Sequence, residues 1–189
     1  GIKTKLYLDG DPMFTHIRLN YERGYLDRVR AHERHFTFGL NIGKPGCKIP
    51  PTGFHWRPTV QPIALGWWEG TLTPPRSNHH ATGAWTTVMN WASYKTEEFA
   101  GETYGQKGIE FEKFMTLPAL TSEKFVLAMG QGPGKKRPTA YLESLGWKII
   151  EPDVHVPDYA SYHDFLSNSK GEWSIAKNGY VKSRSGWFS

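Results

Sequence analysis

The chain has 189 residues, of which 38% are apolar, 22% are charged and 14% are aromatic, with eight tryptophans. These fractions exclude a disordered chain, and because no apolar run approaches the ~20 residues of a bilayer span, we expect no membrane-spanning segment. The net charge of +5 comes from lysines and arginines scattered among acidic residues, which argues against a nucleic-acid-binding protein and favours a small anionic ligand.

The first residues predict a strand, a helix and a second strand. Residues 6–8 form a short apolar strand, and residues 13–29 carry apolar side chains at helical spacing, with a break at Gly24. Residues 35–42 alternate as a half-buried strand does, with these side chains on one face: Phe36, Phe38, Leu40 and Ile42.

Loops and a boundary follow. Residues 44–58 are rich in proline and glycine and predict a loop. Residues 60–65 predict an edge strand, because Pro62 has no backbone N–H to donate. The weakly patterned residues 66–83 predict a boundary, so we expect one unit over residues 1–83 and a second over residues 84–189.

The second half predicts strands that alternate with helices. Gly146 is expected to cap a helix that ends at residue 145. Such alternation predicts an α/β fold, a Rossmann-like parallel sheet with helices on its faces. The expected strands are residues 86–91, 125–129, 147–150 and 173–176, and the expected helices are residues 109–117, 139–145 and 159–167.

Asp9 and Asp11 lie two residues apart at the end of the first predicted strand. In an extended chain both carboxylates point the same way, as a pair that holds Mg²⁺ or Mn²⁺ with substrate phosphates must. Asp11 followed by Pro12 also matches a preferred helix start, with aspartate as the N-cap and proline at the first helical position. We predict the capping role for Asp11. Asp9 stays a candidate for substrate contact, because ligands of open α/β sheets bind at the carboxyl ends of the strands.

Gly130, Gly132 and Gly134 follow a predicted strand and precede a predicted helix. Glycine lets a backbone approach a phosphate closely, and a helix N-terminus carries roughly half a unit of positive charge. The spacing matches neither a Walker loop nor the Rossmann dinucleotide fingerprint. Two interpretations stay open, a phosphate-binding loop and an ordinary glycine-rich turn.

Several histidines are further candidates for metal-binding or catalytic residues. His32 and His35 lack a third metal ligand nearby and predict a solvated helix end. Residues 53–59 combine an imidazole, an indole and a guanidinium, which suits either an acceptor-sugar site or simple packing of the loop. The candidates for a general base are Asp9, His16 and His55.

Five segments together resemble bacterial glycosyltransferases of the two-Rossmann (GT-B) architecture, in particular a group with tryptophan-rich linkers. The likeness extends over nearly the whole chain. The segments are LDGDPMFTH at residues 8–16, HFTFGLNIG at 35–43, HWRPTVQP at 55–62, TTVMNWASY at 86–94 and AKNGYVKSRSGWFS at 176–189.

The resemblance implies transfer of a sugar from a nucleotide-diphosphate donor to an acceptor, without a bound metal or other cofactor. It also implies that the acceptor lies on the N-terminal unit and the donor on the C-terminal unit, where positive groups stabilise the departing diphosphate. The residues that it places near the donor are Ser93, Tyr94, Lys95, Lys107, Gly130, Gly132, Gly134, Lys177 and Asn178.

The length is about half of what two complete Rossmann units need at ~150 residues each. We therefore expect an internal piece of such an enzyme, incomplete at both ends and inactive in isolation. Two alternatives stay open, a metal-dependent transferase that uses Asp9 and Asp11, and a non-enzymatic carbohydrate- or nucleotide-binding protein that uses exposed tryptophans. The single cysteine, Cys47, excludes an internal disulfide and favours a cytoplasmic location.

Overall fold

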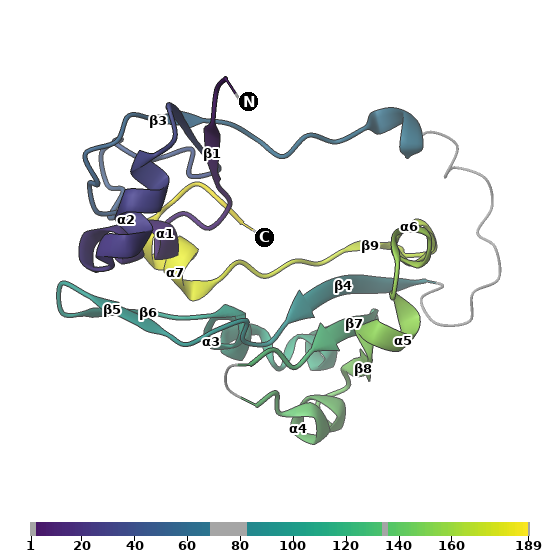
Figure 1. Cartoon of the computed structure of the whole chain (residues 1–189). Helices are drawn as coiled ribbons and strands as arrows, with labels where there is room; N and C mark the ends of the chain where they lie inside the picture. The colour runs from purple at the N-terminus through teal and green to yellow at the C-terminus, as the bar shows by residue number, and fades with distance from the viewer. Residues whose placement is uncertain (1–2, 69–82, 134–135, 189) are drawn as a thin grey trace. The chain divides into compact units, whose positions relative to one another are not determined.

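The computed structural model describes residues 3–68, 83–133 and 136–188. The chain divides into two compact units, which we call unit 1 and unit 2 (Figure 1). Each contains segments that are distant in sequence. Unit 1 comprises Gly1–Pro62, Thr96–Gly105 and Ala176–Ser189, and unit 2 comprises Ile63–Lys95 and Gln106–Ile175.

Unit 1 is built on a small parallel sheet. Its strands β1 (Leu6–Asp9), β2 (Arg34–Thr37) and β3 (Trp56–Pro58) lie in that order, and both neighbouring pairs are parallel. Helices α1 (Phe14–Tyr21) and α2 (Arg23–Arg30) connect β1 to β2. This strand–helix–strand arrangement is the unit from which open α/β sheets are made.

The helix pair in unit 1 forms because its apolar positions recur at helical spacing. Met13, Ile17 and Val29 are completely buried and form the centre of this small core. The break that separates the two helices comes at Glu22, whose backbone is extended, two residues before the predicted break at Gly24. The predicted helix is therefore confirmed with its interruption slightly displaced.

Two later segments complete unit 1. Strands β5 (Glu97–Phe99) and β6 (Glu102–Tyr104) form an antiparallel hairpin. Its two turn residues, Ala100 and Gly101, both have positive φ angles of 51° and 76°, the backbone geometry of a tight hairpin turn. Helix α7 (Asn178–Ser183) also belongs to unit 1.

Unit 2 contains a four-stranded parallel sheet. Its central strands β4 (Ala84–Asn90) and β7 (Lys124–Gly130) pair over seven residues. β8 (Lys148–Ile150) pairs with β7, and β9 (Gly171–Glu172) pairs with β4, which gives the order β8-β7-β4-β9. The remaining elements are η1 (Leu65–Trp67), α3 (Lys107–Phe111), η2 (Glu112–Phe114), η3 (Leu117–Leu120), α4 (Thr139–Ser144), α5 (Pro152–His155) and α6 (Tyr159–Ser167).

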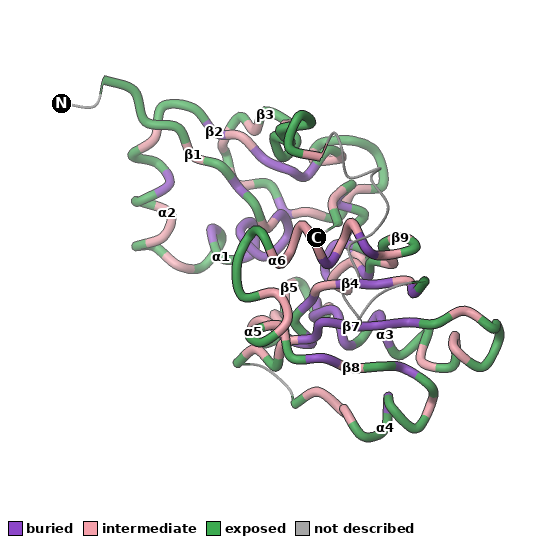
Figure 2. The backbone as a smooth tube through the Cα atoms, turned by 90° about the vertical axis from the view of Figure 1, so that its right-hand side faces the viewer, coloured by how far each residue is buried: buried purple, intermediate pink, exposed green. Residues whose placement is uncertain are grey.

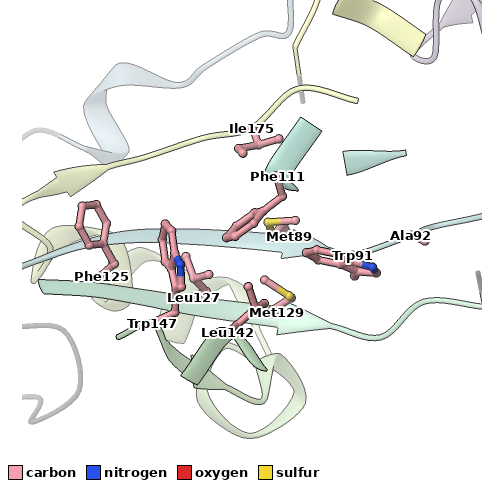
Figure 3. Close-up of a cluster of buried hydrophobic side chains, with 10 residues drawn as sticks. All are labelled: Met89, Trp91, Ala92, Phe111, Phe125, Leu127, Met129, Leu142, Trp147 and Ile175. Atoms are coloured by element: carbon pink, nitrogen blue, oxygen red, sulfur yellow. The ribbon is translucent and has the colours of Figure 1, made fainter. Parts of the chain in front are cut away.

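Apolar side chains cover both faces of the unit 2 sheet. Residues Phe125 to Met129 of β7 are all buried, as expected for the inner strand of a parallel sheet with helices on both faces (Figure 2). One face packs against a cluster rich in aromatic residues (Figure 3): Met89, Trp91, Ala92, Phe111, Phe125, Leu127, Met129, Leu142, Trp147 and Ile175. The other face packs against Ala84, Val126, Ala128, Ile150 and Phe165.

These observations confirm a mixed α/β fold with parallel sheets and flanking helices. Helix α6 has the predicted bounds, and Gly146 follows α4 with a φ of 96°, which fits its capping role. The segments 96–105 and 176–189, predicted within the second unit, belong to unit 1. In the described part of the chain, no helix combines the length and the apolarity that a bilayer span requires.

Three predicted strands need correction. The strand expected over residues 35–42 ends at Thr37, because Gly39 donates its amide to the Thr37 hydroxyl and the chain turns there. The strand expected over residues 60–65 is wrong, and the third strand of unit 1 is instead Trp56–Pro58. The strand expected over residues 173–176 is replaced by Gly171–Glu172.

Candidate functional site

The carboxyl ends of the parallel strands are where an open α/β sheet binds ligands. In unit 1 this edge contains Asp9 and Thr37, the last residues of β1 and β2, which are register partners. In unit 2 it contains Asn90 and Gly130, the last residues of β4 and β7, which are also register partners. The two edges carry different chemistry.

The unit 1 edge is organised by a completely buried carboxylate, that of Asp9. The Thr37 hydroxyl donates to Asp9 Oδ2 at 2.8 Å, and the backbone N–H of Asp11 donates to Asp9 Oδ1 at 3.0 Å. Thr37 Oγ1 in turn accepts from the Gly39 amide at 3.0 Å. Asp9 therefore joins the turn after β1 to the end of β2.

His16, a general-base candidate, lies beside Asp9 and is equally buried. Its Nδ1 lies 3.1 Å from the carbonyl oxygen of Pro50, so Nδ1 carries a proton and donates. Its Nε2 is 3.5 Å from Asp9 Oδ2 and has no hydrogen-bond partner among the described residues. The arrangement can orient an imidazole, but its burial keeps both side chains from direct contact with a ligand at the surface.

Asp11 is held by the start of α7 and is only partly buried. Lys177 Nζ lies 3.1 Å from Asp11 Oδ1, and the Tyr180 hydroxyl donates to the same oxygen. The ammonium group also lies 5.4 Å from the centre of the Phe14 ring, within cation–π range. A methyl group at Gly179 would lie 2.5 Å from that ring, so a larger residue there would force the Phe14 ring to shift.

The predicted capping role of Asp11 is wrong. Helix α1 begins at Phe14, its N-cap residue is Met13 with a φ of 80°, and no side chain caps it. The carboxylate is instead bound to α7, a partner that lies 166 residues away in sequence and gives no local signal.

The Asp9 and Asp11 carboxylates each interact with protein donors, so their geometry does not favour joint coordination of a metal ion. Within residues 3–68, 83–133 and 136–188 there is no group of three histidine, cysteine or acidic side chains arranged to hold a metal. The metal-dependent alternative therefore has no supporting cluster in the described chain.

The unit 2 edge is shaped by glycines. A methyl group at Gly130 would lie 2.2 Å from Asn90 Oδ1, and one at Gly132 would lie 2.1 Å from the carbonyl oxygen of Ala92. Gly132 also has a φ of 64°, in the left-handed region that favours glycine. The end of β7 therefore packs against the Asn90 side chain, and the loop that follows packs against the backbone of Ala92 and Ser93, whose Cα lies 3.3 Å from the methyl position at Gly132.

Arg137 stabilises the loop after β7 through several hydrogen bonds. Its amide donates to Gln131 Oε1 at 3.1 Å and its Nε donates to Thr139 Oγ1 at 3.0 Å. Its guanidinium also donates to the Met129 carbonyl and pairs with Glu151, which directly follows β8. The hydrogen bond from this guanidinium lowers the pKa of the Glu151 carboxyl group. The pairing of Arg137 with Glu151 had no signal in the local sequence, because it depends on the order of the strands.

The structure separates the predicted donor residues into two groups. Ser93, Tyr94 and Lys95 follow β4, and Gly130 and Gly132 follow or end β7, so these lie at one edge of the unit 2 sheet. Lys107 is instead a buried residue that begins α3. Gly134 lies outside the described residues.

Lys177 and Asn178 belong to unit 1. Lys177 binds Asp11, and Asn178 Oδ1 accepts from the Gly105 amide at 3.0 Å. His55, the third general-base candidate, is exposed immediately before β3 and makes no hydrogen bond to Asp9 or His16. These roles stay predictions.

Comparison with protein-family models, curated proteins and solved structures gives no match. Any functional assignment therefore depends on the geometry of the two sheet edges.

Proposed function

We propose that this chain forms part of a glycosyltransferase of GT-B architecture, which moves a sugar from a nucleotide-diphosphate donor to an acceptor. The observation that carries the proposal is the glycine-lined carboxyl edge of the unit 2 sheet. A parallel sheet in each of two units agrees with this architecture, although such sheets serve many functions.

The unit 2 edge suits a diphosphate for two reasons. Gly130 and Gly132 allow the loops after β4 and β7 to approach each other closely, so the segments that carry Lys95 and Lys136 begin side by side at this edge. Lys95 and Lys136, in the segments that follow β4 and β7, are exposed and form no ion pair with any described residue. A departing diphosphate gains negative charge, which nearby ammonium groups stabilise.

The unit 1 edge is the proposed acceptor side. Lys177 is compensated by Asp11, so this edge carries less available positive charge than the unit 2 edge. Metal-independent transfer is proposed because Asp9 and Asp11 have protein donors as partners.

The test is a titration of the ¹⁵N-labelled chain with uridine, guanosine and adenosine diphosphates. We expect one of them to shift the amide signals of Ala92, Ser93 and Gly132, and the corresponding nucleoside to shift them far less. Lys95→Gln should weaken binding by about two- to fivefold, the range of a single exposed charge contact. Lys44→Gln, a change of an exposed lysine in unit 1, is the matched control. Absence of shifts at this edge with every diphosphate would contradict the proposal.

A second candidate is a carbohydrate-binding protein, and one observation favours it. Trp67 is 68% exposed and Tyr159 is 50% exposed, with their ring centres 5.7 Å apart. Exposed aromatic rings offer an apolar face to a sugar. Trp67→Ala should abolish retention on immobilised oligosaccharides under this alternative and should leave diphosphate binding unchanged under the first proposal.

A further inference from the structure

We propose that unit 2 has a second ligand site, at the amino-terminal edge of its sheet, which binds a small phosphate monoester with an apolar body. The site is a cavity of about 400 Å³, within the usual size range of small-molecule sites. It is independent of the proposed transferase function, because it lies at the opposite ends of the strands from the glycine-lined edge.

The start residues of three strands place the cavity. Ala84, Lys124 and Lys148 are the first residues of β4, β7 and β8, and all three line it. The rest of the wall comes from η3 and from the turn between α4 and β8: Pro118, Ala119, Leu145 and Gly146. Two buried residues of β7 also line the cavity, Val126 on one face of the sheet and Phe125 on the other.

The sheet register brings two lysines to the same face. Lys148 is the register partner of Val126, and Lys124 lies two residues before Val126 on the same strand. Partners in register, and residues two apart on a strand, point to the same side of a sheet. The Cα atoms of the two lysines are therefore about 8 Å apart, given ~3.3 Å per residue along a strand and ~4.8 Å between strands. Two lysine side chains span that separation easily.

The charge of the cavity is positive. Neither Lys124 nor Lys148 forms an ion pair with any residue in the described part of the chain. The one acidic side chain in the wall, Glu123, is compensated because Lys170 Nζ lies 2.5 Å from its Oε1 and Trp85 Nε1 donates to its Oε2 at 3.2 Å. The hydrogen bond from Lys170 also lowers the pKa of the Glu123 carboxyl group. Two lysines in a wall that is otherwise largely apolar match a doubly charged phosphate carried on an apolar group.

The turn that closes the cavity depends on glycine. Gly146 has a φ of 96°, and a methyl group there would lie 3.1 Å from Pro118. This close approach brings η3 against the start of β8 and forms the side wall.

The experiment is a titration of the full ¹⁵N-labelled chain with phenyl phosphate at low ionic strength. We expect saturable shifts of the amide signals of Ala119, Val126 and Gly146, with a Kd on the order of 1 mM for a ligand of this size. Benzyl alcohol tests the need for charge, inorganic phosphate tests the need for the apolar body, and benzoate tests the preference for a double charge. Each of the three should bind more weakly than phenyl phosphate.

Four variants test the assignment. Lys124→Gln and Lys148→Gln should each weaken binding by about two- to fivefold, the effect of one exposed charge contact. Ala119→Phe keeps both lysines but fills the cavity, so it should abolish the saturable shifts. Lys44→Gln, in unit 1, should change nothing.

Four results would overturn the proposal: shifts that do not saturate or that spread over the chain, unchanged binding by both Lys124→Gln and Lys148→Gln, equal binding of benzyl alcohol, or equal binding of inorganic phosphate.

Discussion

The two sheets share a parallel topology, yet their carboxyl edges are stabilised in opposite ways. At the unit 1 edge, Asp9 and Thr37 pair through buried side chains that hydrogen-bond the next turn. At the unit 2 edge, Gly130 and Gly132 have no side chain, and the loop backbones pack directly against Asn90 and Ala92.

The two edges therefore differ in the groups that they leave available to a ligand. At the unit 1 edge, the Asp9 carboxylate and the Thr37 hydroxyl are buried and bound to protein groups, so these two side chains have little capacity left for a ligand. The loops at the unit 2 edge carry the exposed ammonium groups of Lys95 and Lys136, which a ligand can reach. We therefore propose the ligand-binding role for the unit 2 edge.

The largest expected effect is at Asp9. Asp9→Ala leaves the Thr37 hydroxyl and the Asp11 amide without their acceptor in a buried place, which should lower the free energy of unfolding of unit 1 by about 4 kcal/mol. Hydrogen exchange of the β1 and β2 amides measures this loss, because exchange rates report on the stability of each unit separately. Asp27→Ala, at a residue with an exposed side chain, is the control and should cost less than about 0.5 kcal/mol. A comparably small cost at Asp9 would show that the buried carboxylate does not stabilise this edge.

Gly132→Ala tests the unit 2 edge. The added methyl group would clash with the Ala92 carbonyl oxygen, and residue 132 has a positive φ that alanine disfavours. Overpacking and backbone strain together should lower the free energy of unfolding of unit 2 by about 3 kcal/mol and abolish diphosphate binding.

The matched control for that change is Gly83→Ala. Gly83 has a φ of 76° in the same unit, but no atom of the described residues lies within 4 Å of the added methyl group. Only the conformational strain remains, about 1 kcal/mol. Urea unfolding followed at unit 2 signals compares the two, and equal losses would mean that the close approach at Ala92 is not limiting.

Lys177→Met should have an intermediate effect. It removes one partner of the partly buried Asp11 carboxylate while the Tyr180 hydroxyl still donates, so we expect a loss of about 1.5 kcal/mol in unit 1. Lys177→Arg should restore most of the lost stability.

The metal-dependent alternative is tested with Mg²⁺. At millimolar concentration it should not change the unfolding midpoint of the unchanged chain. A marked rise with Mg²⁺, lost in Asp11→Asn, would favour the metal-dependent alternative.

The smallest effect concerns the pH dependence of unit 1. Burial, and then the hydrogen bond between the Tyr7 and Tyr25 hydroxyl groups, raise the pKa of Tyr7 above its ordinary value of 10.0. The folded chain therefore favours the neutral phenol, so this contribution to stability is complete below pH 10 and is lost as the pH rises above it. Tyr7→Phe should cost about 1 kcal/mol at pH 7 and make the fall in stability above pH 10 less steep. Parallel pH profiles would exclude Tyr7 as a contributor.

Much of unit 2 could be predicted because its signals are local. Strands β4, β7 and β8 and helices α4 and α6 appear close to their expected positions, since each carries its own apolar periodicity and its own ending residue. The strands of unit 1 were harder. Residues 38–42 continue the alternation of β2, but the Gly39 amide bonds to Thr37 and ends the strand. Residues 56–58 become β3 although they follow a loop rich in proline and glycine, because pairing with β2 overrides local preference.

The sequence by itself determined the alternation of strands and helices, and with it the parallel α/β class, because periodicity and turn chemistry act over a few residues. Only the tertiary structure decided that residues 96–105 and 176–189 join unit 1, and that Asp11 binds Lys177 instead of capping a helix. Those outcomes depend on which distant surfaces meet, and a partner 166 residues away leaves no mark on the local pattern.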